Sequence, residues 1–136
     1  MKFFGIIVLS LLPFCAFAQQ KTDPKADEKA EKELREYIDK QVESLGETLE
    51  LEDWQMFYVD SILTHDYTAM RDEIKSMSAS KVSNSALYER VQDKWTEQTY
   101  QALIGLMDDE QAAKYNKMGA ARDKKARDKR MAKYAK

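Results

Sequence analysis

The sequence is poor in the residues that build disulfides and metal sites. Its 136 residues include one cysteine, Cys15, and one histidine, His65. A single cysteine cannot form a disulfide within the chain, and a single histidine excludes a multi-histidine metal site within one copy. A disulfide-stapled scaffold is therefore excluded, and we expect no metal ion and no other cofactor.

Helix-breaking residues are equally scarce. After Pro24 the chain has no further proline and only three glycines, Gly46, Gly105 and Gly119. The stretches between them are rich in Glu, Lys, Ala and Leu, which favour helices. We predict an all-α protein with about four helices.

No arrangement of residues predicts catalysis. Glycine is too scarce for a phosphate-cradling loop, and the chain has no Cys–His pair after residue 18 and no serine nucleophile motif. The carboxylates of Asp108, Asp109 and Glu110 fit a helix N-terminus, where negative charge is favourable. His65 fits a solvated helix face, and the scattered methionines fit adaptable packing positions. We therefore predict that the protein is not an enzyme.

Residues 1–18 have the three regions of a secretory signal peptide. Lys2 is followed by an apolar run from Phe3 to Leu12 and by the small-x-small sequence 16–18, Ala-Phe-Ala. The apolar run is short for a membrane span, and no stop-transfer pattern follows it. We expect cleavage after Ala18 and export, to a periplasm or an equivalent compartment.

A lipid anchor is the rival interpretation of this segment. Cys15 would need a small residue directly before it, but Phe14 stands there.

Export also makes nucleic acid a poor partner. The polar residues 19–28 show no periodicity and predict a disordered lead-in, and residues 29–118 predict a helical domain.

Apolar periodicity predicts two helices in the first half of that domain. One should run from about Asp27 to Leu45, with Gly46 as a left-handed C-cap. The second should run from about Glu52 to Met77. The stripe of the first helix consists of Leu34, Tyr37, Ile38, Val42 and Leu45.

The second half of the domain predicts two more helices. Ser83 is the expected N-cap of the third, with Val82 and Leu87 as its hydrophobic staple. This helix should end near Gly105. Asp108 should then cap the fourth helix, with Gln111 as its capping-box partner.

The last segment, residues 119–136, is strongly basic. It carries eight Lys or Arg and two Asp, and ARDK occurs in it twice. Because its charges lie on all sides of a helix, a solvated, frayed helix end is the simplest expectation. The alternative is electrostatic contact with acidic proteins, with a second chain or with an anionic membrane surface. The residues that would make this contact are Arg122, Lys124, Lys125, Arg127, Lys129 and Arg130.

One short pattern occurs twice, at the starts of the second and fourth helices. The pattern is an apolar residue, a polar residue, any two residues and then glutamine. It occurs as Leu-Glu-Asp-Trp-Gln at residues 51–55 and as Met-Asp-Asp-Glu-Gln at residues 107–111. In physical terms the apolar residue staples the turn, the polar residue caps the helix and the glutamine closes a capping box. The structural motif residues are Leu51, Gln55, Met107, Asp108 and Gln111.

The pair of patterns resembles the Leu-Thr-x-x-Gln motifs of the Spy and CpxP family of small periplasmic stress proteins. The resemblance covers roughly residues 30–120. It implies that the helices form an extended helical hairpin arrangement in which the two motifs lie near each other. It further implies that two chains pair antiparallel into a thin, curved cradle. It also implies an ATP-independent chaperone or envelope-stress protein that holds unfolded proteins on the concave face.

This sequence departs from the family pattern at three positions. Glu52 and Asp108 replace the threonines, and Met107 replaces the second leucine. Because Glu52 is a poor N-cap, a box from Glu50 to Asp53 is equally possible. The family cradle is basic, whereas residues 19–118 carry a net charge of −9.

Aromatic residues are more numerous than one thin helical core needs. Most should pack between the second and third helices, but amphipathic rings are also typical of contact surfaces. Trp54, Tyr58 and Trp95 are the candidate protein-binding residues. We expect an exported protein that binds unfolded or envelope proteins, with a second copy of the chain as a further partner in a homodimer. The alternative is a structural or adaptor protein with one folded partner.

Overall fold

The computed structural model describes residues 23–136, and in this range the protein is all-helical. The signal peptide prediction falls on residues outside this range. The predicted all-α class is confirmed. The elements are α1 (Pro24–Leu49), α2 (Asp53–Ala79), α3 (Ser85–Leu106), α4 (Asp109–Tyr115), the π-helical turn η2 (Asn116–Ala120) and α5 (Ala121–Tyr134).

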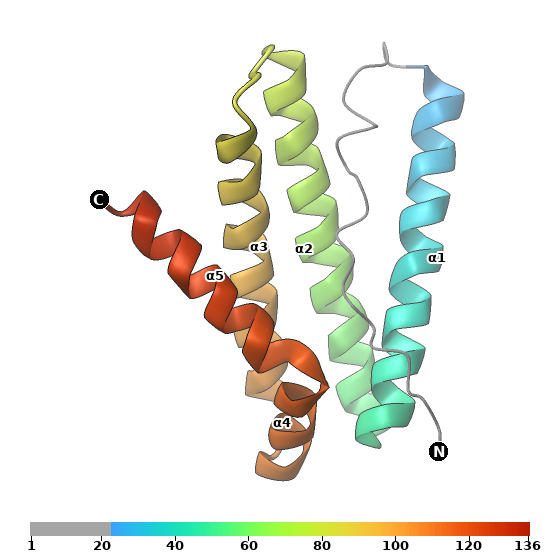
Figure 1. Cartoon of the computed structure of the whole chain (residues 1–136). Coiled ribbons are helices and arrows are strands. Elements are labelled where there is room, and N and C mark those ends of the chain that lie inside the picture. The colour runs from blue at the N-terminus through green and yellow to red at the C-terminus, as the bar shows by residue number, and fades with distance from the viewer. Residues whose placement is uncertain (1–22) are drawn as a thin grey trace, which may run out of the picture.

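The three long helices lie in a row, each antiparallel to the next, with α2 in the middle (Figure 1). The short helix α4 follows α3 and lies at the same end of the molecule as the turn between α1 and α2. From there α5 turns back and crosses α3 obliquely. None of the helices formed by residues 23–136 is long and apolar enough to cross a membrane.

Two clusters of buried apolar side chains hold this row together. The first lies where α1, α2 and α3 meet near α4, and its most buried members are Ile38, Val59 and Leu103. The second lies between the far halves of α2 and α3 and consists of Met70, Ile74 and Val91. Each fully buried aliphatic side chain contributes about 1.5–3 kcal/mol to folding. Neither cluster includes a side chain from α5.

The first helix begins earlier than its periodicity predicts. It starts at Pro24, and Oδ1 of Asp23 accepts a hydrogen bond from the Lys25 N–H at 3.1 Å. Proline suits the first helical position because it has no N–H to leave unpaired. Residues 24–28 are therefore helical and not part of a disordered lead-in.

The prediction that Gly46 is a left-handed C-cap is wrong. The helix continues to Leu49, and Glu50 adopts the left-handed conformation instead, with φ 52°. Gly46 is buried inside the helix, where the Met56 side chain packs against it. A Cβ atom at Gly46 would lie 2.7 Å from Met56 Cε, so any larger residue would force the Met56 side chain to move.

The third helix begins one residue later than expected. Asn84, not Ser83, is its N-cap, and its side chain accepts from the Ala86 N–H at 3.0 Å. Asparagine and serine are equally good N-caps, so the sequence alone does not separate them. The turn is closed by Tyr88, whose hydroxyl donates to the Val82 carbonyl at 2.6 Å.

The basic segment is not a solvated, frayed end. It forms α5, which packs on α3, and the Arg127 side chain is only 4% exposed. The chain reverses at Gly119, whose φ of 123° is a conformation that residues with a side chain rarely adopt. The charge of the segment alone does not predict this packing, because the partners of these cations are carboxylates on α3.

Candidate functional site

The repeated pattern forms two capping boxes, as predicted. At the start of α4, Oδ1 of Asp108 accepts from the Gln111 N–H at 2.7 Å, and Oε1 of Gln111 accepts from the Asp108 N–H at 3.1 Å. At the start of α2, Glu52 is the N-cap, and its N–H donates to Oε1 of Gln55 at 2.9 Å. Glu50 belongs to the end of α1, so the alternative box from Glu50 to Asp53 does not form.

The two glutamines also contact each other. Nε2 of Gln55 donates to Oε1 of Gln111 at 2.8 Å, and Nε2 of Gln111 donates to Oε1 of Gln55 at 3.2 Å. Nε2 of Gln55 lies 2.9 Å from the Leu106 carbonyl as well. Gln55 is only 4% exposed, so its amide has no access to bulk water to replace these partners. We call this reciprocal pair the glutamine clamp.

The apolar residues of the pattern complete the same structure. Leu51 and Met107 are half-buried and pack against the first cluster. Each stands directly before its capping residue, as the stapling role requires. The five motif residues thus close the end of the molecule where the α1–α2 and α3–α4 turns meet.

Three aromatic side chains on the first two turns of α2 point away from the cores. Trp54 is 50% exposed, Phe57 67% and Tyr58 50%. The Tyr58 ring packs edge-on against both neighbours, with centroid distances of 6.2 Å to Trp54 and 5.6 Å to Phe57. We call these three residues the aromatic patch. Phe57 was not among the predicted contact residues, because helical spacing alone does not separate an outward ring from a core ring.

Trp95, the third predicted contact residue, lies apart from the aromatic patch. It is half-buried against the second cluster, and its indole N–H donates to Oε2 of Glu73 at 2.7 Å. Nζ of Lys94 also donates to Glu73, at 2.6 Å, and lies 5.1 Å from the Trp95 ring. The Lys94 hydrogen bond, aided by that of Trp95, lowers the pKa of Glu73 against the opposing effect of burial. Trp95 therefore packs α3 against α2.

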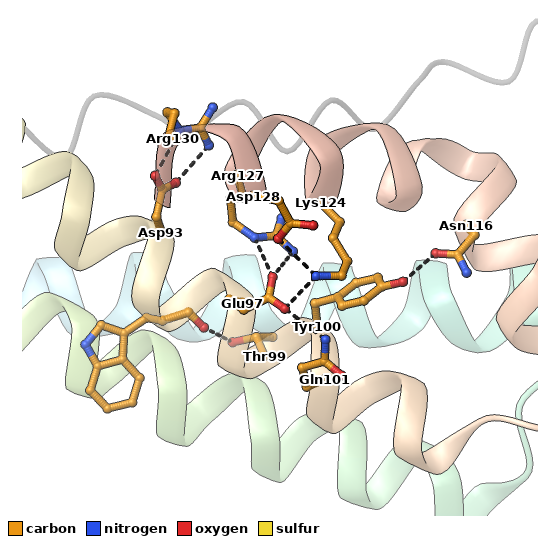
Figure 2. Close-up of polar contacts among 11 residues, drawn as sticks. Asp93, Glu97, Thr99, Tyr100, Gln101, Asn116, Lys124, Arg127, Asp128 and Arg130 are labelled. Carbon is orange, nitrogen blue, oxygen red and sulfur yellow. Dashed lines mark hydrogen bonds and ion pairs between the residues drawn. The ribbon is translucent and has the colours of Figure 1, made fainter. Parts of the chain in front are cut away.

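The predicted basic contact residues divide into two groups. Lys124, Arg127 and Arg130 face α3 and bind its carboxylates (Figure 2). Lys125 and Lys129 are exposed and form no ion pair with any residue in the range 23–136. Arg122 is exposed and donates to its neighbour Asp123.

Glu97 is the centre of the contact between α3 and α5. It accepts from Lys124 at 2.9 Å, from Arg127 at 2.9 Å and from Gln101 at 2.8 Å. Burial alone would raise the pKa of Glu97, but these hydrogen bonds outweigh it and lower the pKa to about 2. Glu97 is therefore ionised throughout the physiological pH range.

A buried carboxylate that sequence reasoning missed joins α2 to α3. Asp66 is 3% exposed, and its oxygens lie 2.8 Å from Nδ1 of His65, 3.0 Å from Nε2 of Gln98 and 2.8 Å from Oγ1 of Thr99. Because the chain has many acidic residues, its sequence does not show which of them is buried. The partners of Asp66 are consistent with a polar contact in the helix interface, since buried carboxylates need several donors.

A groove of about 250 Å³ lies between α1 and α2. Arg35 is one of its polar residues, but it donates to Thr64 at 3.0 Å and forms ion pairs with Asp39 and Asp60. These hydrogen bonds raise the pKa of Arg35 further. Its charge is thus already balanced. Within residues 23–136 no three His, Cys, Asp or Glu side chains gather closely enough to hold a metal ion.

Comparison with known proteins gives no assignment. No family model, no curated protein and no solved structure matches the chain. The aromatic patch, the glutamine clamp and the α3–α5 contact are the features of this chain that bear on its function.

Proposed function

We propose that the protein is an exported, non-enzymatic binding protein that holds other proteins through the aromatic patch. The observation that carries the proposal is the group of three adjoining aromatic side chains, each at least half exposed, on one helix. Aromatic residues are enriched in protein interfaces because each buries a large area with little loss of conformational freedom. On a chain this polar, such a group is better explained by contact than by packing.

The helix beneath the patch is held firmly. Val59 and Leu63 lie on the opposite side of α2 and are almost completely buried, and the glutamine clamp fixes the first turn of α2. The rings therefore lie on a rigid base, which reduces the entropy lost on binding. Three rings offer a small contact area, so each contact should be weak and reversible.

Weak, reversible contacts suit a protein that holds unfolded chains without ATP. The contact between Gln55 and Gln111 supports the resemblance to the Spy and CpxP family, in which the two motifs lie near each other. We therefore propose an ATP-independent chaperone or envelope-stress protein. The acidic body and Glu52 at the position of a family threonine are the features of this chain that argue against it. An antiparallel homodimer remains part of this proposal.

The second candidate function is that of a structural or adaptor protein with one folded partner. The same aromatic patch favours it, because a few rings in a small area can also form the centre of a specific interface. The two functions differ in selectivity: a chaperone protects many unrelated unfolded proteins, whereas an adaptor protects none of them.

The test measures aggregation of several chemically unfolded client proteins by light scattering, with an equimolar amount of the full chain. The triple variant Trp54→Ser, Phe57→Ser, Tyr58→Ser should lose most of the protection. Leu87→Ser is the matched control, since Leu87 is a large exposed apolar side chain on another helix. Circular dichroism of each variant checks that the helices are retained.

Two outcomes would contradict the proposal. If the triple variant protects as well as the natural chain, the aromatic patch is not the contact surface. If the natural chain protects no client at all, the chaperone function is wrong and the adaptor function becomes the better one.

A further inference from the structure

The contact between α3 and α5 follows a regular pattern of charge. Glu89, Asp93 and Glu97 stand four residues apart and so share one face of α3. We call these three carboxylates the acidic stripe. Nε and Nη2 of Arg130 donate to Asp93 at 2.9 and 2.8 Å, and the Tyr134 hydroxyl donates to Glu89. Figure 2 shows Lys124 and Arg127 pointing at Glu97, and Arg130 pointing at Asp93.

The cations of α5 have a matching spacing. Lys124, Arg127 and Arg130 stand three residues apart, which places them on one face of their helix. Arg127 donates to Oε2 of Glu97 from both Nε and Nη2, at 3.1 and 2.9 Å. The charged ends of Lys124 and Arg127 each lie 5.6 Å from the centre of the Tyr100 ring. A helix with this spacing of positive charge therefore fits the acidic stripe and Tyr100 together.

Apolar packing contributes little to this contact. The only buried side chain of α5 is Arg127, and the largest apolar one, Met131, is 36% exposed. No α5 residue belongs to either buried cluster. Arg127 and Asp93 are buried in the contact, whereas the side chains of Lys124 and Arg130 stay 29% and 36% exposed. Partly exposed ion pairs are weak and screened by salt, so α5 should detach more easily than the helices whose side chains enter the buried clusters.

The connection before α5 suits such detachment. Gly119 has φ 123° inside the π-helical turn η2, so the helix direction already changes there. Glycine is free to adopt other backbone conformations at this position. A change at this residue alone would swing α5 away while α4 keeps its capping box.

The sequence of α5 is not the most favourable one for binding the acidic stripe. Asp123 and Asp128 lie within this basic helix, and Asp128 accepts from Lys124 at 3.1 Å. Lys124 therefore divides its charge between Asp128 and Glu97. A segment with the same spacing of cations but without these two carboxylates would bind the acidic stripe more strongly.

We propose that the acidic stripe and Tyr100 form a docking site for a basic helical segment of another protein, which α5 covers until that segment displaces it. The partner segment carries Lys or Arg at every third position and few carboxylates. A second copy of the chain is a less favoured partner. Its α5 would make the same contacts as the chain's own α5, but it lacks the high effective concentration that the covalent connection gives to the chain's own helix. This inference does not depend on the aromatic patch.

The test follows the distance between α3 and α5 in the full chain by spin-label spectroscopy. Labels are placed at cysteines introduced at the exposed Ala86 and Ala132, with Cys15→Ala to prevent labelling elsewhere. The probe is a peptide of residues 121–134 with Asp123→Ala and Asp128→Ala. It should lengthen the distance, at a concentration about tenfold below that needed for the natural α5 peptide. A peptide with the same residues in scrambled order should have little effect.

Two variants separate docking from general charge attraction. Asp93→Asn with Glu97→Gln should open α5 without any peptide and should bind the peptide at least about tenfold more weakly. Glu110→Gln, which removes a carboxylate outside the stripe, should change neither property. Circular dichroism establishes that α1 to α3 stay helical.

Two results would overturn the proposal. If the peptide binds while the distance stays short, the acidic stripe is not the docking site. If mixing singly labelled copies gives a distance between molecules instead, α5 exchanges between two copies and the foreign partner is wrong.

Discussion

Gln55 and Gln111 donate hydrogen bonds to each other although 56 residues separate them in the sequence. Each glutamine also closes the capping box of its own helix, at the start of α2 or of α4. The pair therefore joins two chain reversals, and both helix starts depend on it. Replacing one glutamine removes a cap and leaves polar groups of the other motif without a partner.

Replacing Gln55 should destabilise the protein more than replacing Gln111. Gln55→Ala removes bonds to Glu52, Leu106 and Gln111 at a buried position, and we expect a loss of about 2–3 kcal/mol. Gln111→Ala should cost about 1–2 kcal/mol because its cap is more exposed. The measurement is the free energy of unfolding in urea.

The double variant tests whether the two glutamines act as one unit. The cost of Gln55→Ala with Gln111→Ala should be about 1 kcal/mol smaller than the sum of the single costs. Gln92→Ala, a half-buried glutamine on α3, is the control and should change stability by less than about 0.5 kcal/mol. Additive costs would show that the clamp contributes nothing beyond the two caps.

The capping boxes could be predicted because they depend on residues three apart in the sequence. Asp108 and Gln111 form the predicted box, and Gln55 closes the box at Glu52. That the two glutamines meet was implied only by the family resemblance, since local spacing does not say which turns come together. The role of Gly46 was missed for the same reason, because its neighbour Met56 lies on the next helix.

The three glycines of the helical part should respond differently to alanine. Gly105 has open space around its Cβ position, so Gly105→Ala should stabilise the protein by about 0.5–1 kcal/mol through helix propensity. At Gly46 the added Cβ would lie 2.7 Å from Met56 Cε, so we expect Gly46→Ala to cost about 1 kcal/mol in spite of the same propensity gain.

Gly119→Ala should also be destabilising, by about 1–2 kcal/mol, because alanine is strained at a φ of 123°. Thermal and urea unfolding of the three variants check the order Gly105, Gly46, Gly119 from stabilising to destabilising. Equal stability of the Gly46 and Gly105 variants would show that Met56 moves aside without cost.

The basic tail shows where composition misleads. Its cations lie on all sides of a helix, which predicts solvation, but the side of Arg127 is covered by α3. Counting charge gives no information about where the opposite charges lie. The carboxylates that bind Arg127 and Arg130 stand on α3, 30 and 37 residues earlier in the chain. The spacing of four among Glu89, Asp93 and Glu97 was the available signal.

Acid should weaken the contact between α3 and α5. The pKa of Glu97 falls from its ordinary value of 4.5 to about 2 on folding, so its ionised form favours the folded state. Its contribution is complete above about pH 4.5 and is lost as the pH falls towards 2. The difference in unfolding free energy between the natural chain and Glu97→Gln should therefore shrink between about pH 6 and about pH 2.5. A constant difference would mean that Glu97 does not titrate with folding.

Residues of the aromatic patch should be dispensable for folding. Phe57→Ser should change the free energy of unfolding by less than about 0.5 kcal/mol, since its side chain is 67% exposed. Leu63→Ala, one turn and a half further along α2 but 2% exposed, should cost about 2–5 kcal/mol. A large loss of stability in Phe57→Ser would indicate that the ring packs in the folded chain and is not kept for contact.

The buried carboxylate of Asp66 gives the last prediction. Oγ1 of Thr99 lies 2.8 Å from Oδ2 of Asp66, and Asp66 is only 3% exposed. Thr99→Val keeps the shape of the side chain but removes the donor, so one carboxylate oxygen loses a partner that water cannot easily replace. We expect a cost of about 1–3 kcal/mol in urea unfolding. Thr96→Val, one turn earlier on α3, is the control and should be nearly neutral, and an equal cost for both would mean that the hydroxyl bond to Asp66 adds no stability.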